Sequence, residues 1–564
     1  MNFRTPDCYR RPAFPFHCGA LYRAALLTLF ICQTVGLADS NYVVLQPTAG
    51  GLSATPDLSS TTLSNGALGL TWNGFAGPYQ VETRSNLTSG SWAPIGPATN
   101  AHGLTVPASA ARGFLRVNGK APVFVSADVC ADCHPQKHAD WSQTIHAGAF
   151  DTLKAISQDK NPACVTCHTV GSGFSTGFID ETTTPFFAGV QCENCHGPAG
   201  SHILDVNNLA VRPVKTPSAM LCGGCHNGFH HPTYEEWTTA PHSIVVPDVA
   251  ANFLTTNATA RMQSCGPCHS GAVRLALLDW KNKGTLTLPS GHDAATFAVT
   301  CTVCHDAHKP NLDNTHSLRN PRYSTNFFSY NTSTSTTFTN QYNANVQVCG
   351  QCHNMRGAAP TDTSRPPHHS PQYNILIGDA GASLGYVPAA TTNELSSHRN
   401  IIDQCTHCHN HAHTVANPSE ENPNFTGHDF KPHFEGCVEC HTDLTTVTNL
   451  MANTQSDITQ RIGELKGLLD SWATTKAPDV LRTKYGALTW EYNIPGQLSN
   501  PTNDPSLRGP TATEQADVPS DIKSARMYLY LIQHDGSLGV HNAKYSRYLL
   551  SLAKTNVVNR LSGP

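Results

Sequence analysis

One five-residue motif, Cys-x-x-Cys-His, occurs nine times in this chain of 564 residues. Its two cysteines have the spacing that forms thioether bonds to the two vinyl groups of one haem, and the histidine that follows directly can bind the haem iron. The nine motifs use 18 of the 21 cysteines, and the other three, Cys8, Cys18 and Cys32, all precede residue 39. A chain with nine such attachment sites has to fold around cofactors.

We number the motifs 1 to 9 in chain order. The predicted haem-attachment cysteines are Cys130 and Cys133, Cys164 and Cys167, Cys192 and Cys195, Cys222 and Cys225, Cys265 and Cys268, Cys301 and Cys304, Cys349 and Cys352, Cys405 and Cys408, and Cys437 and Cys440. The predicted proximal iron ligands, in the same order, are His134, His168, His196, His226, His269, His305, His353, His409 and His441. Any single Cys-x-x-Cys pair could instead bind zinc, but a zinc site needs no histidine directly after its second cysteine. Because all nine pairs have that histidine, the sequence predicts nine covalently attached c-type haems.

The composition also favours a fold built on cofactors. Hydrophobic residues make up 39% of the chain and charged residues 13%, beside 42 Gly and 38 Pro. Because such a chain is poor in the aliphatic residues that fill an ordinary core, we expect the porphyrins to supply apolar bulk and the apoprotein to be unfolded in this region. The net charge of −4 implies neither nucleic acid nor a membrane surface as a partner.

Residues 1–38 have the pattern of an export signal. Arginines precede an apolar run over 24–35, and Gly36-Leu37-Ala38 offers a small-residue cleavage site. The run is too short to span a membrane. Cleavage after Ala38 would remove all three unpaired cysteines, so we expect an exported protein, periplasmic or at the cell surface, with no membrane span in the mature chain.

The segment before the motifs, residues 39–125, contains short alternating runs such as Leu68-Gly69-Leu70-Thr71-Trp72, separated by turn-forming residues. This pattern predicts a small, antiparallel, β-sandwich-like module. Its general look is that of fibronectin-like modules on exported proteins, and we expect it to act as a spacer or to dock a partner.

The nonahaem domain is expected over 126–445, with a surface loop at 311–345 that is rich in Asn, Ser and Thr. Within it, His138, Trp141 and His146 follow motif 1, and His231, Trp237 and His242 follow motif 4, which indicates a loose internal duplication.

The last region, 446–564, is expected to be helical and to pack on the haem domain or a second subunit. Apolar residues at helical spacing predict helices over 454–474, 520–533 and 542–558, with 478–518 extended.

The residue opposite each proximal histidine decides what a haem can do. A second histidine saturates the iron and suits it to electron transfer, whereas an open position lets a substrate bind. The 30 His suffice for every iron, and only six Met are present. The predicted distal ligands are His146, His202, His242, His292, His308, His369, His398, His428 and His541, with His138, His231, His368, His413 and His433 as the nearest alternatives.

Motifs 2 and 3 carry a resemblance to a known family. Cys164-Val165-Thr166-Cys167-His168, followed by a segment 189–198 that reads GVQCENCHGP, resembles the tetrahaem cytochrome c-554 family. The wider group includes octahaem hydroxylamine oxidoreductase and pentahaem ammonia-forming nitrite reductase, and residues 301–308, 367–372, 397–398, 427–430 and 539–542 look like its later haem units. The dense spacing of the motifs leaves little room for regular sheet and favours a mainly α-helical and irregular fold around stacked haems. The resemblance, over residues 126–560, implies haems that alternate between parallel and perpendicular pairs close enough for tunnelling.

Two departures from that group bear on function. Its nitrite reductases carry Lys in place of one proximal histidine, whereas all nine motifs here end in His, and its hydroxylamine oxidoreductases use a Tyr that cannot be singled out among 16 here. The leading hypothesis is therefore an electron carrier without catalytic residues, acting between redox proteins such as a quinol dehydrogenase or other cytochromes. Two alternatives stay open: an oxidoreductase of a small nitrogen or sulfur compound (nitrite, hydroxylamine) at one five-coordinate haem, and a subunit of a conducting filament. The C-terminal helices are compatible with a homo-oligomer.

Overall fold

The computed structural model describes residues 42–44, 57–64, 67–73, 76–86, 89–96, 103–107, 113–120, 122–213, 215–255, 258–308, 316–319, 348–401 and 404–563. The predicted export signal and most of the predicted surface loop at 311–345 lie outside the described residues. The chain divides into two compact units. The first contains the described residues up to Pro122 together with Asp205–Val211, and the second contains Val123–Leu204 and the residues from Arg212 onward.

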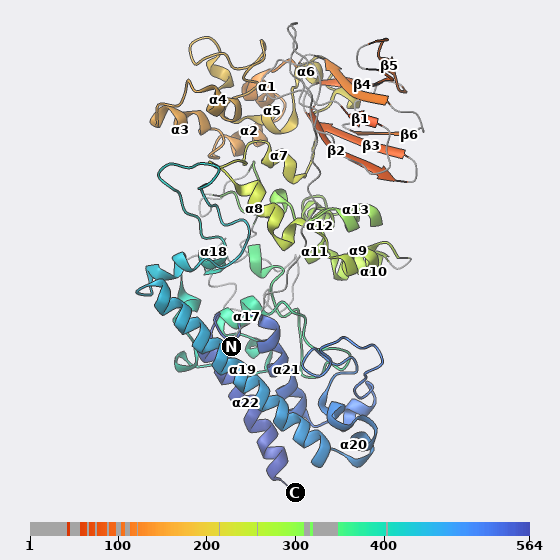
Figure 1. Ribbon diagram of the computed structural model, residues 1–564, viewed down its shortest axis with the longest axis vertical. Helices are drawn as coiled ribbons and strands as arrows, with labels where there is room; N and C mark the ends of the chain where they lie inside the picture. Colours follow the sequence, from red (N-terminus) through yellow and green to blue (C-terminus); the bar gives the residue numbers. More distant parts are fainter. Residues whose placement is uncertain are drawn as a thin grey trace, which may run out of the picture. The chain divides into compact units, whose positions relative to one another are not determined.

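The first unit is built from two small β-sheets (Figure 1). Its strands are β1 (Tyr42–Val44), β2 (Asp57–Ser64), β3 (Ala67–Asn73), β4 (Ala76–Arg84), β5 (Ala93–Pro94), β6 (Gly103–Pro107) and β7 (Gly113–Lys120). One sheet has the order β1-β7-β4-β5 and the other β2-β3-β6. All described pairings are antiparallel except that of β1 with β7, which is parallel.

Alternate residues of both sheets form one buried cluster. It contains Leu70, Trp72, Tyr79, Val81, Val106, Leu115 and Val117. Because these side chains come from both sheets, the sheets pack face to face. A 3-10 helix, η2 (Leu209–Val211), packs on β4 and thereby returns a later segment to this unit.

Short helices joined by loops make up the part of the second unit that carries the motifs. They are α1 (Ser126–Ala131), α2 (Pro135–Trp141), α3 (Ala149–Ala155), α4 (Pro162–His168), α5 (Cys192–His196), α6 (Gly200–Leu204), α7 (Ala219–Gly223), α8 (Thr233–Thr239), α9 (Pro247–Phe253), α10 (Ala258–Ser264), α11 (Gly266–His269), α12 (Gly271–Lys283), α13 (Gly291–Thr296), α14 (Cys301–Cys304), α17 (Gln372–Ile377) and α18 (Gln404–His409). Shorter 3-10 helices are η1 (Pro185–Phe187), η3 (Pro241–Ser243), η4 (Ala382–Leu384), η5 (Thr392–Glu394), η6 (Ser397–Asn400) and η7 (Phe434–Glu439). The protein is thus mainly helical with small β-sheets, as predicted.

Longer helices close the chain: α19 (Leu444–Thr475), α21 (Ser520–Asp535) and α22 (Ala543–Ser562). The predicted helices are all present, but α19 begins earlier than expected because the side chain of Asp443 caps it by accepting a hydrogen bond from the Thr446 N–H. The segment 478–518 is not simply extended. It contains α20 (Asp479–Tyr485) and the 3-10 helices η8 (Gly486–Trp490) and η9 (Glu514–Asp517), since its Pro and Gly residues end helices without preventing them.

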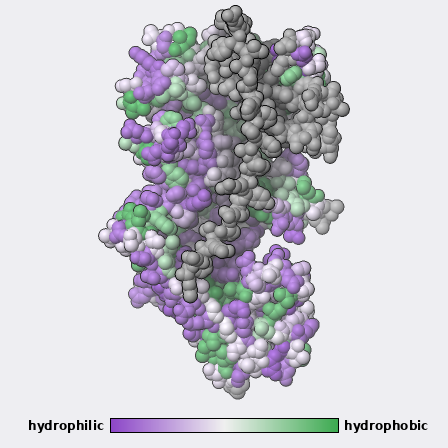
Figure 2. All heavy atoms as spheres, viewed as in Figure 1, coloured by the Kyte–Doolittle hydropathy of each residue, from purple (hydrophilic) through white to green (hydrophobic). Residues whose placement is uncertain are grey.

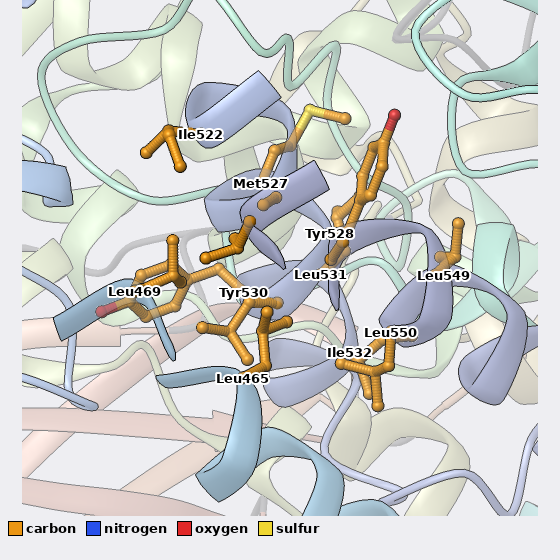
Figure 3. Close-up of a cluster of buried hydrophobic side chains, with 14 of the residues drawn as sticks. Leu465, Leu469, Ile522, Met527, Tyr528, Tyr530, Leu531, Ile532, Leu549 and Leu550 are labelled. Atoms are coloured by element: carbon orange, nitrogen blue, oxygen red, sulfur yellow. The ribbon is translucent and has the colours of Figure 1, made fainter. Parts of the chain in front are cut away.

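The C-terminal helices have a hydrophobic core of their own. Figure 3 shows Leu465 and Leu469 of α19 beside Tyr530 and Leu531 of α21, with Leu549 of α22 in the same cluster. The cluster also takes in residues that follow motif 7, such as Ile375 of α17. Burial of aliphatic side chains is therefore concentrated in this bundle, while the motif-bearing part of the unit has smaller clusters.

The surface of the described residues is mixed in polarity. On the face in Figure 2, hydrophobic residues form several separate patches between hydrophilic ones. Among the helices that are described, none is both long enough and apolar enough to cross a membrane.

Candidate haem sites

Each motif forms one helical turn. In motifs 1, 4, 5, 6, 7 and 9 the histidine N–H donates to the carbonyl oxygen of the first cysteine at 2.8–3.1 Å, and motifs 2, 3 and 8 lie within α4, α5 and α18. Positions i, i+3 and i+4 share one face of a helix. Both thiols and the imidazole of a motif therefore face the same side, which attachment to a single haem requires.

Seven proximal histidines face a second histidine from a distant part of the sequence. The ring centres are separated by 5.8 to 6.3 Å in every pair. The pairs are His196 with His308, His226 with His146, His269 with His368, His305 with His428, His353 with His242, His409 with His541, and His441 with His398.

These separations fit an iron held between two imidazoles. A metal–imidazole bond is about 2 Å long, and each ring centre lies just over ~1 Å behind its nitrogen, so the two ring centres of such a pair are about 6 Å apart. The donor set fits as well, because each pair belongs to a motif whose two thiols lie on the same side as its histidine. The residues present can hold c-type haem.

Hydrogen bonds fix the orientation of several rings. The Nδ1 atoms of His168, His305, His398 and His409 lie 2.7 to 3.1 Å from backbone carbonyl oxygens of Ala149, His316, Val540 and Phe430, respectively. A protonated Nδ1 that donates to a carbonyl leaves the lone pair on Nε2 free for a metal. The backbone thus selects the tautomer that a haem iron needs.

Burial favours the neutral form of six rings in the proximal–distal pairs. Desolvation, with a smaller contribution from neighbouring histidines, lowers the pKa of His226, His242 and His428 to about 4. The pKa of His146, His305 and His353 is lowered mainly by desolvation too. Neutral imidazole is the form that binds a metal.

His541 differs from the others. Its Nδ1 lies 2.6 Å from a carboxylate oxygen of Asp535. Burial acts to lower the pKa of His541, but the charge of Asp535 and this hydrogen bond together raise it.

A repeated backbone device positions two of the distal candidates. The Trp141 indole donates to the Val190 carbonyl oxygen at 2.9 Å, and the Val190 N–H donates to the His146 carbonyl oxygen at 2.9 Å. The preceding Gly189 has a φ of +87°, and a Cβ there would lie 2.5 Å from the Ala147 carbonyl oxygen, so the close approach requires glycine.

The same contacts recur after motif 4. Trp237 donates to the Val299 carbonyl oxygen at 3.0 Å, and the Val299 N–H donates to the His242 carbonyl oxygen at 3.1 Å. In both cases these contacts link the distal candidate to the valine two residues before a motif. That motif is the second one further along the chain, at Cys192 after motif 1 and at Cys301 after motif 4. The internal duplication indicated by the sequence is therefore present in three dimensions.

Motif 1 is linked to a different distal candidate. The buried carboxylate of Glu193 accepts hydrogen bonds from the Val125 and Ser126 N–H groups at the start of α1 and from the Ala199 N–H just before α6. It thereby joins the helix of motif 1 to the helix that carries His202. The Nδ1 atom of His202 is buried with no hydrogen-bond partner among the described residues.

Motif 2 has His231 in its neighbourhood. Desolvation lowers the pKa of His231, and the next contribution comes from the proximal His168. From the sequence alone, His231 is only an alternative distal ligand.

Two predicted distal ligands are placed differently from the rest. His292 is exposed, with 79% of its side chain accessible, and its ring contact is with the adjacent Asp293. His369 stacks on His368 with ring centres 4.2 Å apart, and it is His368 that lies 6.0 Å from the proximal His269. The sequence could not separate His368 from His369 because their spacings to every motif differ by only one residue.

Cysteines of different motifs lie close enough to interact with one another. The thiols of Cys130 and Cys192, Cys167 and Cys225, Cys222 and Cys301, Cys268 and Cys352, and Cys349 and Cys405 shift one another's pKa. Electrostatic interactions between cysteines show that three more pairs of motifs are neighbours. They act between Cys195 and Cys222, between Cys304 and Cys349, and between Cys408 and Cys437. Motifs 1, 3, 4, 6, 7, 8 and 9 are thus neighbours in that order, with motif 2 beside motif 4 and motif 5 beside motif 7.

The chain is similar in part to known cytochromes. The family model for cytochrome c554 and c-prime matches residues 129–197. Cytochrome c-554 of Nitrosomonas europaea is 28% identical over 163 residues, which cover 23% of this chain and 68% of that protein. The multiheme cytochrome MtrA of Shewanella baltica is 30% identical over 146 residues, 23% of this chain but only 39% of that protein.

A solved structure is similar over a longer stretch. The outer cell wall cytochrome OcwA has 18% sequence identity and a TM-score of 0.49, covering 77% of this chain and 99% of that one. The family match and the first relative are c-type cytochromes, and the second relative is a multiheme cytochrome. Together with the repeated Cys-x-x-Cys-His motif, they identify this chain as a multihaem c-type cytochrome.

Proposed function

We propose that this protein is an exported nonahaem cytochrome that transfers electrons between redox partners along a chain of haems, each with two histidine ligands. The observation that carries the proposal is the set of seven proximal–distal ring pairs with centres about 6 Å apart. Two imidazoles saturate an iron, which suits it to electron exchange and leaves no position for a substrate.

The haems of motifs 1 and 2 also have a histidine as their second ligand. His202 serves motif 1, supported by its unpartnered buried nitrogen and by the Glu193 bridge between the two helices. His231 serves motif 2, supported by its interaction with His168. His368 takes the place of His369 at motif 5, and His292 is left without an iron. The cofactors are nine haems bound through all 18 motif cysteines.

The contacts between motif cysteines support a route for electrons. The route passes motifs 1, 3, 4, 6, 7, 8 and 9, and haems 2 and 5 branch from it at motifs 4 and 7. When bound, haem supplies reversible one-electron chemistry at each motif. The chain's own residues orient the imidazoles through backbone carbonyls and hold them in buried surroundings.

The residues outside the motifs would serve assembly and docking. The β-sheet unit serves as a docking or spacing module, and the segment between α21 and α22 supplies the distal ligand of motif 8, His541. Other redox proteins are the partners, and the location is periplasmic or at the cell surface, as the pattern of residues 1–38 suggests.

The direct test is the mass and electrochemistry of the purified protein. The intact mass is expected to exceed that of the polypeptide from residue 39 onward by nine haems, and film voltammetry is expected to show reversible one-electron steps without added substrate. A mass that accounts for fewer than nine haems would contradict the count. A current that grows only with nitrite or hydroxylamine would favour an enzyme.

A further inference from the structure

A buried carboxylate contacts one of the proposed distal ligands. Asp535 lies at the C-terminal end of α21 with 3% of its surface exposed. One of its oxygens accepts a hydrogen bond from His541 Nδ1 at 2.6 Å, and the other accepts one from the Ser537 hydroxyl. In the part of the chain that the structure describes, no Lys or Arg forms an ion pair with it. Its negative charge is therefore directed mainly at His541.

Most of the other oriented rings have neutral partners. His398 and His409 donate to the backbone carbonyl oxygens of Val540 and Phe430. His308 does have a carboxylate nearby, but its Nδ1 lies 3.4 Å from Asp306, and Arg319 binds that carboxylate at 3.0 Å. The charge on Asp306 is thus largely compensated, whereas that on Asp535 is not.

A hydrogen bond from Nδ1–H to a carboxylate makes the imidazole a more basic ligand. It gives the ring partial imidazolate character, and the nearby negative charge stabilises a ferric iron more than a ferrous one. Both effects favour the oxidised state. Reduction of such a haem adds one electron to the iron and leaves its two axial bonds in place.

We propose that Asp535, acting through His541, lowers the reduction potential of the haem attached at Cys405 and Cys408 below that of its neighbours. The inference rests on the proposed function, in which His409 and His541 are the axial ligands of that haem. Because motif 8 stands between motifs 7 and 9, electrons passing between them have to cross an uphill step. Asp535 is thus a positioning residue that limits the rate of electron exchange at this end of the chain.

The experiment is a spectroelectrochemical titration of the full, haem-loaded protein with Asp535→Asn. Asparagine keeps the size and can still accept from His541, but it has no charge. We expect one haem to become at least tenfold easier to reduce, a shift of about 59 mV for one electron, and one low-spin electron paramagnetic resonance signal to move. Asp470→Asn is the control: Asp470 accepts from the Trp490 indole in the same bundle and contacts no proposed ligand, so all potentials are expected to stay unchanged.

A further variant distinguishes an error in the role of Asp535 from an error in the ligand assignment. His541→Met tests the ligand itself and is expected to replace one bis-histidine signal by a histidine–methionine one. If it does so while Asp535→Asn leaves every potential unchanged, the proposed role of Asp535 is wrong and the proposed function stands. If His541→Met changes no signal, the ligand assignment is wrong and the inference falls with it.

Ser537→Ala gives a check of opposite sign that does not depend on the asparagine variant folding. Removing the hydroxyl frees one carboxylate oxygen, so Asp535 becomes a stronger acceptor for His541. It also removes the acceptor of the His541 backbone N–H, a neutral contact that adds no charge at the ring. The potential of the same haem is expected to fall. A rise in that potential would overturn the inference.

Discussion

At the scale of the residue, a histidine can hold an iron only where the chain carries its ring opposite a proximal ring. His242 meets this condition, with its ring centre 6.2 Å from that of His353. His292 does not, because its side chain is exposed and contacts Asp293. Two residues of the same type thus have different roles that follow from their surroundings.

Replacing each of these histidines by alanine tests the difference. His242→Ala is expected to leave one haem with a single protein ligand, so one high-spin ferric signal should appear in the electron paramagnetic resonance spectrum. His292→Ala is the matched control and should leave the spectrum unchanged. A high-spin signal from the control, or none from His242→Ala, would contradict the assignment.

The same residues show what a sequence can and cannot predict here. The cysteines and proximal histidines of a motif lie within one helical turn, so their relation is local and can be predicted from the sequence. The distal histidines depend on distant segments: His541 lies far along the chain from His409. His368 and His369 are adjacent in sequence, and only their position in the fold separates them.

At the scale of the element, the Trp–Val–His contacts join a distal candidate to the segment just before the second motif further along the chain. The Trp237 indole donates to the Val299 carbonyl oxygen, and the Val299 N–H donates to the carbonyl oxygen of His242. The recurrence of Trp and His after motifs 1 and 4 could be noticed in the sequence. The role of the valine could not be predicted, because its backbone atoms make the contacts and every residue has a carbonyl oxygen.

Trp237→Phe is expected to destabilise this region. The substitution keeps the aromatic packing but leaves the Val299 carbonyl without its indole donor, which costs roughly 1 to 3 kcal/mol. Guanidinium unfolding followed at the haem absorption band should show a lower midpoint. Trp92→Phe, in the β-sheet unit beside Arg116, is the control and should leave that midpoint in place. An unchanged midpoint for Trp237→Phe would mean that the hydrogen bond contributes nothing.

At the scale of the whole molecule, the chain uses two kinds of core. The C-terminal helices bury Leu465, Leu469, Ile522 and their neighbours in an ordinary hydrophobic cluster. The part between motifs 1 and 7 has small hydrophobic clusters and short helices, and we expect its apolar interior to depend on the haems. This dependence is a prediction from composition. The C-terminal helices could also be predicted from the sequence, but not the cluster that they share with residues after motif 7.

Protein made without haem attachment is therefore expected to fold in part. Amides of α19, α21 and α22 should stay protected in hydrogen exchange, because their hydrophobic contacts do not involve porphyrin. Amides of residues 130–280 should exchange rapidly, because that segment has only small, separate hydrophobic clusters. The haem-loaded protein is the control and should be protected in both parts. Equal protection of the two parts in the haem-free protein would contradict this division.

The central claim is that every iron has two protein ligands. Low-temperature electron paramagnetic resonance of the oxidised, haem-loaded protein tests it most directly, with and without nitrite or hydroxylamine. The account predicts low-spin ferric signals alone, unchanged by either compound. A high-spin ferric signal that shifts when one of them is added would contradict it and would point to an open iron where a substrate binds.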